Sequence, residues 1–388
     1  MQSGGQLRNI ILPSTVDECL REEDLTLPQI RRVIPQQYLR PDPLRSWWEL
    51  VRVLGCMTFC LYLLSLVRLG EAIDLMWQVP ALVSLWILYG WVLVGLFVIG
   101  HDCGHYSFSR RKWVNDLVGY LCMSPLANSF HSWRLTHNHH HVHTQLRGQE
   151  VDWAANLVTQ EEFKSLKWKQ SFMTRLGYSL PFGMFLWITW NTVRRGVMVR
   201  TLLTPHQSTK EGRKLLWSNA IMLISLLAIY GGLGYFYGLW GMLKYHGIPA
   251  TIAMISGGLI ITIQHANQHS LLYEKSGWTS VRGQLASTFD VRFPAWMEYL
   301  WCHINIHIPH HISPVIPWYY LKEVSQHIQA TYADYYQEQN FSLGHLTWFY
   351  RTPFLKKIDG KGYYILELAE KGRSIGLSEI GSKGNGNP

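Results

Sequence analysis

The sequence lacks the features that mark several large protein classes. Its six cysteines form no CxxC pair, which argues against both a disulfide framework and a thiolate zinc site. The first 46 residues contain no long apolar run, so a secretory signal peptide is not expected. The HExxH signature of zinc proteases is absent, and the net charge of +9 comes without a nucleic-acid-binding motif. We therefore expect neither a zinc protease nor a protein that binds nucleic acid.

Apolar residues are concentrated in four long blocks. The second block, Leu75 to Gly100, runs for 26 residues without a charged side chain. A membrane-spanning helix needs about 20 apolar residues, and Trp and Tyr are typical of the membrane interface, where they cluster here. The sequence therefore predicts an all-α integral membrane protein with four transmembrane helices, interfacial helices and a histidine-rich metal-binding cap. The expected spans are about 50–69, 75–100, 215–243 and 247–264.

Three further stretches are apolar but interrupted. Residues 25–44 carry four prolines before the pair Trp47 and Trp48, and residues 113–130 and 176–193 contain Pro or Asn. We expect all three to lie along the membrane surface rather than to cross it.

The distribution of positive charge gives the expected orientation. Four spans place both termini and all histidine clusters on one side, together with 33 of the 35 lysines and arginines. The other side receives only Arg68 and Lys244. The positive-inside rule assigns the histidine side to the cytoplasm. We expect an N-terminal segment (1–46), a membrane domain (47–350) and a C-terminal cytoplasmic tail (351–388).

Histidine is concentrated in two windows. Fourteen of the 18 histidines lie in 101–143 and 265–311. Helical spacing puts His101 and His105 on one face, and three histidines of each later cluster within an arc of about 100°. These later sets are His137, His140 and His141, and then His307, His310 and His311. About eight imidazoles exceed the four ligands of zinc and predict a pair of redox metal ions.

Other residues near the clusters have supporting or structural interpretations. By the same arithmetic His139 faces away, and we expect His131 and His143 to be outer groups as well. His303 lies one helical turn before His307 on the same arc and could be a ligand, but Pro309 is expected to bend that helix, so we expect His303 in the second shell. Carboxylates or amides that could orient ring N–H groups are Asp102, Asn138, Asp152 and Asp290, with a helix cap as an equal alternative for Asp102. For Cys103 and Cys302 we expect packing rather than ligation.

The clusters resemble the three histidine boxes of the membrane fatty acid desaturases. The resemblance is carried by the stretches His101-Asp102-Cys103-Gly104-His105, His137-Asn138-His139-His140-His141 and His307-Ile308-Pro309-His310-His311, and by Gln264-His265. It covers roughly residues 25–350 and is nearest to the Δ12 (omega-6) acyl-lipid branch of cyanobacteria and plastids.

This resemblance implies a site and a reaction. Two iron ions, Fe²⁺ when reduced, would be bound by the eight histidines above, with His265 as a ninth ligand. The substrate would be the acyl chain of a membrane glycerolipid, the oxidant O₂, and the electron donor ferredoxin, since the haem motif His-Pro-Gly-Gly of a fused cytochrome domain is absent. The thylakoid or plasma membrane of a cyanobacterium-like organism is the expected location.

Two alternatives remain at this point. A relative with the same iron centre could act as an omega-3 or Δ9 desaturase, or as a hydroxylase or ketolase on a carotenoid or alkane. A histidine-rich metal transporter would need ionisable groups along its spans, and the spans here contain almost none.

Overall fold

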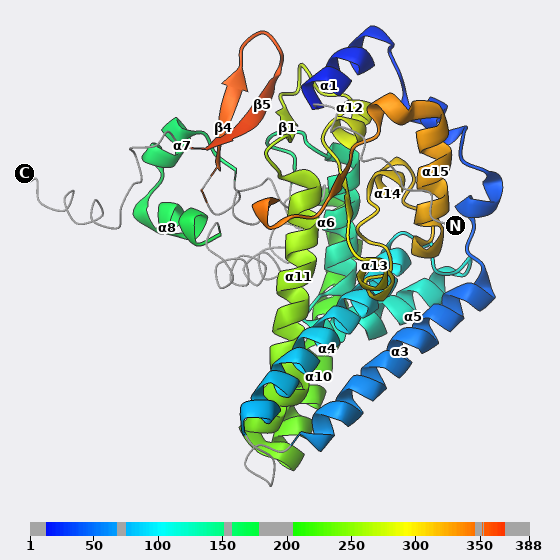
Figure 1. The fold of residues 1–388 in the computed structure, drawn as a ribbon, viewed down its shortest axis with the longest axis vertical. Helices are drawn as coiled ribbons and strands as arrows, with labels where there is room; N and C mark the ends of the chain where they lie inside the picture. The colour runs from blue at the N-terminus through cyan, green and yellow to red at the C-terminus, as the bar shows by residue number, and fades with distance from the viewer. Residues whose placement is uncertain are drawn as a thin grey trace, which may run out of the picture.

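The computed structural model has a stem of long helices, and short helices, loops and strands cover one end of it (Figure 1). The structure describes residues 13–67, 75–150, 157–177, 205–345, 351 and 353–368. Each apolar block of the sequence lies in a stem helix. These helices are α3 (Pro43–Leu66), α4 (Leu75–Gly104), α10 (Pro205–Met242) and α11 (Ile248–His265).

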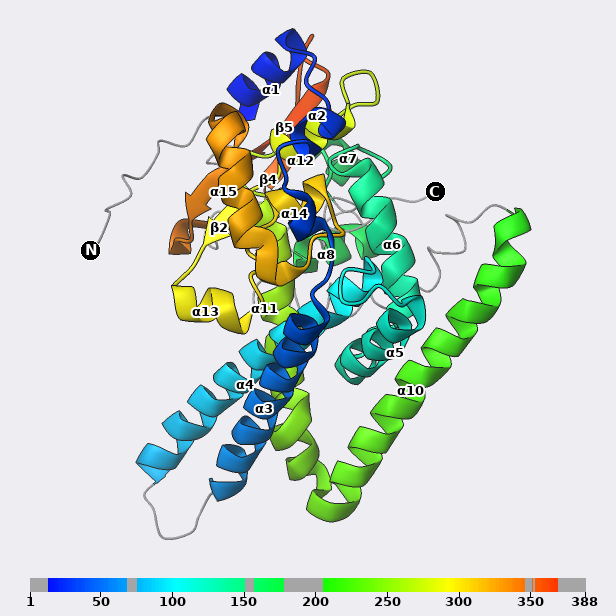
Figure 2. The same ribbon diagram turned by 90° about the vertical axis from the view of Figure 1, so that its right-hand side faces the viewer.

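Three helical stretches among the described residues are long and apolar enough to cross a membrane: Pro43–Leu66, Leu75–Gly104 and Glu211–His265. The third stretch reverses direction. Gly238 has a φ of 63°, and the π-helical turn η4 (Leu243–Gly247) follows. The Tyr230 hydroxyl lies 3.0 Å from Nδ1 of His246, whereas 16 residues of straight helix would separate them by about 24 Å. Figure 2 shows α10 and α11 as the two arms of a hairpin.

Close packing around α4 holds the stem together. A side chain at Gly90 would place its Cβ 2.6 Å from Ile252 Cγ2, so only glycine permits the approach of α11. At the end of the stem remote from the cap, Lys244 Nζ donates to the Val67 carbonyl at 2.6 Å, and Trp86 Nε1 donates to the Lys244 carbonyl at 2.9 Å. The turn of the α10–α11 hairpin therefore meets the end of α3, and α4 and α11 both finish at the cap.

The cap is built mainly from short helices. They are α1 (Pro13–Glu22), α2 (Leu27–Arg31), η1 (Gln36–Leu39), α5 (Lys112–Met123), η2 (Ser124–Leu126), α6 (Phe130–His143), α7 (Gln160–Ser165), α8 (Trp168–Gly177), α12 (Ser280–Leu285), α13 (Ala295–Leu300), α14 (Ile308–Ile312), η5 (Trp318–Tyr320), α15 (Leu321–Tyr332) and η6 (Ala333–Tyr335). Trp113, Leu117 and Leu121 form an exposed apolar stripe on α5. Such a stripe suits the surface helix predicted there.

The prediction of an all-α fold was wrong in one respect, because the cap also contains strands. An antiparallel sheet has the order β1-β5-β4, made by β1 (Leu271–Tyr273), β5 (Tyr363–Leu368) and β4 (Pro353–Ile358). A second pair, β2 (Asp290–Arg292) and β3 (Glu338–Asn340), is parallel. The turn between β4 and β5 contains Gly360 and Gly362, whose φ values are 72° and 71°. Glycine adopts such positive φ values without strain, and for that reason this part of the predicted C-terminal tail can form a β-hairpin.

The N-terminal helix α1 is tied to the cap by a buried carboxylate. Asp17 is 0% exposed and accepts from Arg282 Nε at 2.6 Å and from the Tyr273 hydroxyl at 2.8 Å. Arg21 on the same helix donates to it at 2.9 Å. A buried charge is stable only when it is paired in this way, so this contact fixes α1 over α12.

Candidate metal centre

Four helices bring the predicted histidines to one place at the junction of stem and cap. His101 lies in the last turn of α4 and His105 follows it directly, His137, His140 and His141 line α6, and His265 ends α11. His307 precedes α14, which carries His310 and His311. Every one of these nine side chains is buried, with at most 8% exposed.

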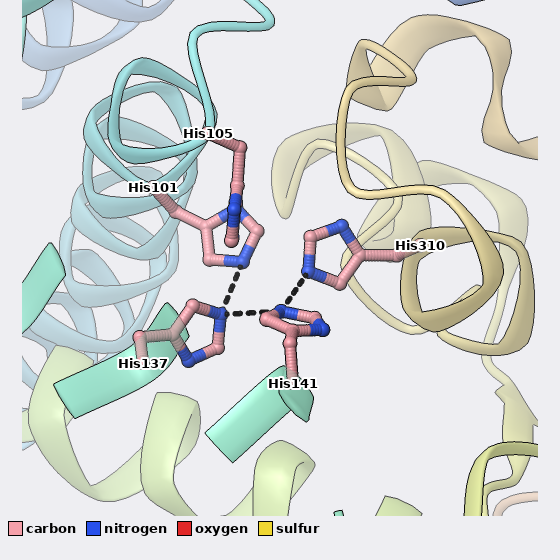
Figure 3. A group of neighbouring side chains, drawn as sticks. All are labelled: His101, His105, His137, His141 and His310. Carbon is pink, nitrogen blue, oxygen red and sulfur yellow. Dashed lines mark hydrogen bonds between the residues drawn. The ribbon is translucent and has the colours of Figure 1, made fainter. Parts of the chain in front are cut away.

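Five of the histidines form a first group, which Figure 3 shows. The candidate ligand atoms of His101, His105, His137, His141 and His310 all lie within 4.8 Å of one another. Nε2 of His137 is 3.1 Å from Nε2 of both His101 and His141, and Nε2 of His141 is 3.0 Å from Nε2 of His310. Three elements, α4, α6 and α14, thus supply one group.

A second group lies beside the first. It contains His140, His265 and His311, again within 4.8 Å of one another. Nε2 of His307 extends it, at 2.9 Å from Nε2 of His265 and 3.0 Å from Nε2 of His311. The rings of His141 and His311, one from each group, are 4.4 Å apart between centroids.

The residues fit a bound metal ion. Burial, and then the neighbouring imidazoles, hold the pKa values of His137, His141 and His310 well below the ordinary histidine value. These rings are therefore neutral, which is the form that binds metals. Two ligands at right angles on an ion with metal–nitrogen distances of about 2.1 Å would be about 3.0 Å apart, as the Nε2 atoms are here. Nε2 of His105 is buried without a hydrogen-bond partner among the described residues. A metal ion would satisfy it.

Each group has one buried carboxylate against a ring nitrogen. Asp102 Oδ1 lies 3.3 Å from Nδ1 of His101, while its Oδ2 accepts from the Trp318 backbone N–H at 2.9 Å. Glu150 places both oxygens on Nδ1 of His140, at 2.8 and 2.9 Å. A carboxylate on the outer ring nitrogen fixes the tautomer so that Nε2 faces the metal. Asp102 therefore contacts the His101 ring and, through the Trp318 N–H, the first residue of η5.

Asp290 supports the site through the backbone rather than through a ring. Its Oδ1 accepts from the N–H groups of His307 at 2.6 Å and Ile308 at 2.8 Å, at the start of α14, and its Oδ2 accepts from the Tyr336 hydroxyl. Burial raises the pKa of Asp290 to about 7 despite these donors. Asp290 was predicted to accept from a ring N–H, but it instead accepts from backbone N–H groups at the start of α14. These bonds hold the first turn of α14 in place.

Three polar residues near the histidine clusters, His139, Asn138 and His303, do not point into the two groups. His139 does face away, and its Nε2 contacts the Gln149 carbonyl at 3.0 Å. The prediction for Asn138 was wrong: it is exposed, because the helix turns it about 100° away from His137. His303 does not lie one helical turn before His307. Its φ is 50°, so no helix links the two, and its ring packs against Trp318 at 5.6 Å.

The remaining predicted residues lie away from the groups or outside the described residues. Neither Cys103 nor Cys302 belongs to either histidine group, although both are buried. His131 contacts Glu211 on α10 at 2.6 Å. Asp152 and most of 176–193 lie outside the described residues.

Glu150 and Thr144 are the site residues that the sequence reasoning missed. Thr144 Oγ1 lies 3.3 Å from Nδ1 of His311. Glu150 is the first acidic residue after the second histidine cluster, which was a usable signal. The prediction placed that role two residues later, at Asp152, because spacing alone does not say where a loop turns back.

Comparison with known proteins agrees with this geometry. The family model described as fatty acid desaturase matches residues 31–342. The chain is 30% identical over 336 residues to the sn-1 oleoyl-lipid 12-desaturase of Picosynechococcus, covering 86% of this chain and 90% of that protein. It is 30% identical to the chloroplastic omega-6 fatty acid desaturase of Brassica napus, covering 81% and 66% of the two chains.

A third relative is the sn-1 acyl-lipid omega-3 desaturase (ferredoxin) of Nostoc, which is 26% identical over 87% of this chain and 89% of that protein. These relatives and the match over most of the length agree with the buried histidine groups at the end of apolar helices. The chain therefore belongs to the fatty acid desaturase family.

Proposed function

We propose that the protein is an acyl-lipid desaturase that introduces a cis double bond at the Δ12 position of glycerolipid acyl chains. The observation that carries the proposal is the convergence of the histidines of all three boxes into two adjacent buried groups, in a chain of this family. The Δ12 position follows the names of relatives such as the oleoyl-lipid 12-desaturase. The omega-3 relative makes omega-3 desaturation the second candidate.

The two groups are proposed to bind two iron ions. The ligands of the first ion would be His101, His105, His137, His141 and His310, and those of the second His140, His265, His307 and His311. Nine imidazoles exceed the four ligands that one zinc ion takes, and the proposed reaction needs a metal that changes its oxidation state, which iron does and zinc does not. When bound, iron supplies the activation of O₂ that allows hydrogen to be removed from two neighbouring methylene groups.

The protein's own residues position this chemistry. Trp133 stacks on His137 with ring centroids 4.4 Å apart, and lies 5.3 Å from the ring of His101. Gly104 is required beneath it, because a Cβ there would lie 2.6 Å from Trp133 Cζ3. The ring thereby holds two ligands in place and gives the first group an apolar wall. Burial of the ligands excludes water from the reacting atoms.

The proposed topology has four spans, with the cap and both termini in the cytoplasm. The reversal between α10 and α11 supports two spans within the stretch Glu211–His265. In this topology nearly all lysines and arginines of the sequence would fall on the cap side, which is the distribution that the positive-inside rule predicts for the cytoplasmic side. The electron donor is proposed to be ferredoxin, which the name of the Nostoc relative includes.

The test is the fatty acid profile of a host that makes only monounsaturated chains, expressing this protein with a ferredoxin and its reductase. We expect a second double bond at Δ12 in membrane lipids. A bond elsewhere would change the assigned position, while an unchanged profile from iron-loaded protein would refute the desaturase proposal. The His140→Ala variant serves as the inactive control.

A further inference from the structure

We propose that electrons enter at a cationic surface formed by residues 31–46 and 318–327, where an acidic one-electron carrier protein docks, and pass through Trp318 and Asp102 to the first histidine group. This inference rests on the proposed function. We call the surface the carrier surface. Figure 2 shows the chain before α3 descending beside α14 and α15, which places the two segments together.

The inner part of the route is a hydrogen-bonded chain. The Trp318 backbone N–H donates to Asp102 Oδ2 at 2.9 Å, and Asp102 Oδ1 lies 3.3 Å from Nδ1 of His101. Trp318 is 4% exposed and Asp102 is 4% exposed, so both lie inside the protein. Electron tunnelling is efficient across hydrogen bonds and bonded atoms and inefficient through gaps. This chain is therefore a direct link from the base of the cap to a histidine of the first group.

The outer part of the route is a ladder of aromatic rings. Trp318 packs on Tyr319 at 5.8 Å, Tyr319 on Tyr320 at 4.7 Å, and Tyr320 on Tyr38 at 5.1 Å. Tyr319 is buried, whereas Tyr38 and Tyr320 are half-buried. The ladder thus begins next to the candidate metal centre and ends at the surface. The helix that follows Tyr38 in the chain, α3, carries the exposed pair Trp47 and Trp48, which suits the membrane interface.

Positive charge surrounds the outer end of the ladder. The guanidinium of Arg45 lies over the rings of Tyr319 and Tyr320, at 4.7 and 5.1 Å. The two segments carry five cations against two acidic residues, and the exposed members include Arg40 and Lys322. The cations are Arg31, Arg32, Arg40, Arg45 and Lys322. Such a surface attracts an acidic partner and speeds its association.

The half-buried side chain of His303 is affected by the positive charge of the same region. Its pKa is lowered to about 4, first by burial and then by Lys322, Arg292, Arg52 and Arg45. Charges from separate segments therefore act together at this edge of the cap. The field has the sign that an acidic carrier requires.

The stoichiometry explains why a transient docking surface is needed. Two C–H bonds are broken and O₂ is reduced to two waters, which takes four electrons. The two C–H bonds supply two, and the donor must supply the other two together with two protons from solvent. A one-electron carrier therefore binds and leaves twice for each double bond. Docking through charge rather than a large apolar interface suits this exchange.

The test compares two reductants on the metal-loaded full-length protein. One is reduced [2Fe–2S] ferredoxin, and the other is dithionite with a small mediator that needs no docking surface. We expect the double variant Arg40→Glu, Lys322→Glu to raise the KM for ferredoxin at least tenfold, with kcat at saturation and the dithionite-driven rate unchanged. Lys164→Glu, an exposed lysine on α7 on the opposite side of the cap in Figure 1, is the matched control and should leave the KM unchanged.

The internal route has its own measurement. Trp318→Phe and Trp318→Leu keep the backbone N–H to Asp102 but weaken the aromatic ladder, so reduction by saturating ferredoxin should slow, more in the leucine variant. Dithionite-driven reduction and iron content should stay the same. Equal ferredoxin-driven rates in the two variants and the parent protein would overturn the route.

The outcomes separate the possible failures. An unchanged KM in the charge-reversal variant overturns the docking proposal. The charge-reversal variant could instead lose activity equally with both reductants and bind vesicles of anionic lipid more weakly than vesicles of neutral lipid. That result would assign the surface to lipid head groups and would also overturn the docking proposal. Absence of desaturation by the parent protein with either reductant would refute the proposed function, and this inference with it.

Discussion

Replacing Glu150 by Gln should weaken metal binding at one of the two histidine groups. The carboxylate is 5% exposed and contacts Nδ1 of His140 through both oxygens, at 2.8 and 2.9 Å. It also accepts from the backbone N–H of Gln145 at 3.3 Å. Glutamine keeps the volume and one acceptor but removes the charge that makes the imidazole a stronger ligand.

The size of the effect follows from these contacts. A hydrogen bond to a charged group contributes about 1.5–3 kcal/mol and a neutral one about 0.5–1.5 kcal/mol, so the amide should lose roughly 1–1.5 kcal/mol. That difference is about a tenfold change in affinity. Outer-sphere partners of metal ligands as a class are worth about 10- to 100-fold. We therefore expect about tenfold for Glu150→Gln and closer to a hundredfold for Glu150→Ala.

The assay is iron retention against a graded Fe²⁺ chelator, with desaturation of lipid measured on the same samples. Of the two iron ions proposed above, one should be lost about tenfold more easily, and activity should fall with it. Glu161→Gln, an exposed acid on α7, is the control and should behave like the parent protein. Parallel loss of both irons, or full retention with full activity, would refute the assignment of Glu150 to the His140 group.

Three further changes have expected outcomes. His140→Ala should abolish desaturation, whereas His139→Ala should retain it, because only His140 belongs to a buried group; equal loss in lipid analysis would contradict the facing argument. Asp17→Ala should destabilise the protein by about 3–5 kcal/mol, since it leaves Arg282 buried without its partner. The midpoint of thermal unfolding in detergent measures this, with the exposed Glu18→Ala as control, and equal midpoints would show that α1 is not held by this contact. Replacing iron by Zn²⁺ should restore the thermal stability lost on chelation but not activity, because zinc has no redox chemistry; desaturation by the zinc form would exclude a redox metal centre.

The sequence by itself determined the chemistry of the site and the main helices. Helical periodicity is a local property, so spacing alone separated His137, His140 and His141 from His139. Apolar length is equally local, and it located α4 from its first residue. The surface helix expected within 113–130 was likewise predicted from a local feature, the Asn and Pro residues that interrupt its apolar run, and α5 lies there with an exposed apolar stripe.

Only the tertiary structure decided which groups of distant segments meet. The division of the histidines into two groups mixes residues from α4, α6, α11 and α14, and no local pattern encodes it. The carboxylate on Nδ1 of His140 is that of Glu150, because the loop after α6 folds back. Asn138, which was also expected to orient a ring, is instead turned outward by the helix. His303 and its neighbour Cys302 both have positive φ, a backbone state that side-chain spacing does not reveal and that a helix running through His303 does not allow. Long-range contacts depend on how the whole chain closes, and for that reason they could not be predicted from the residues one segment at a time.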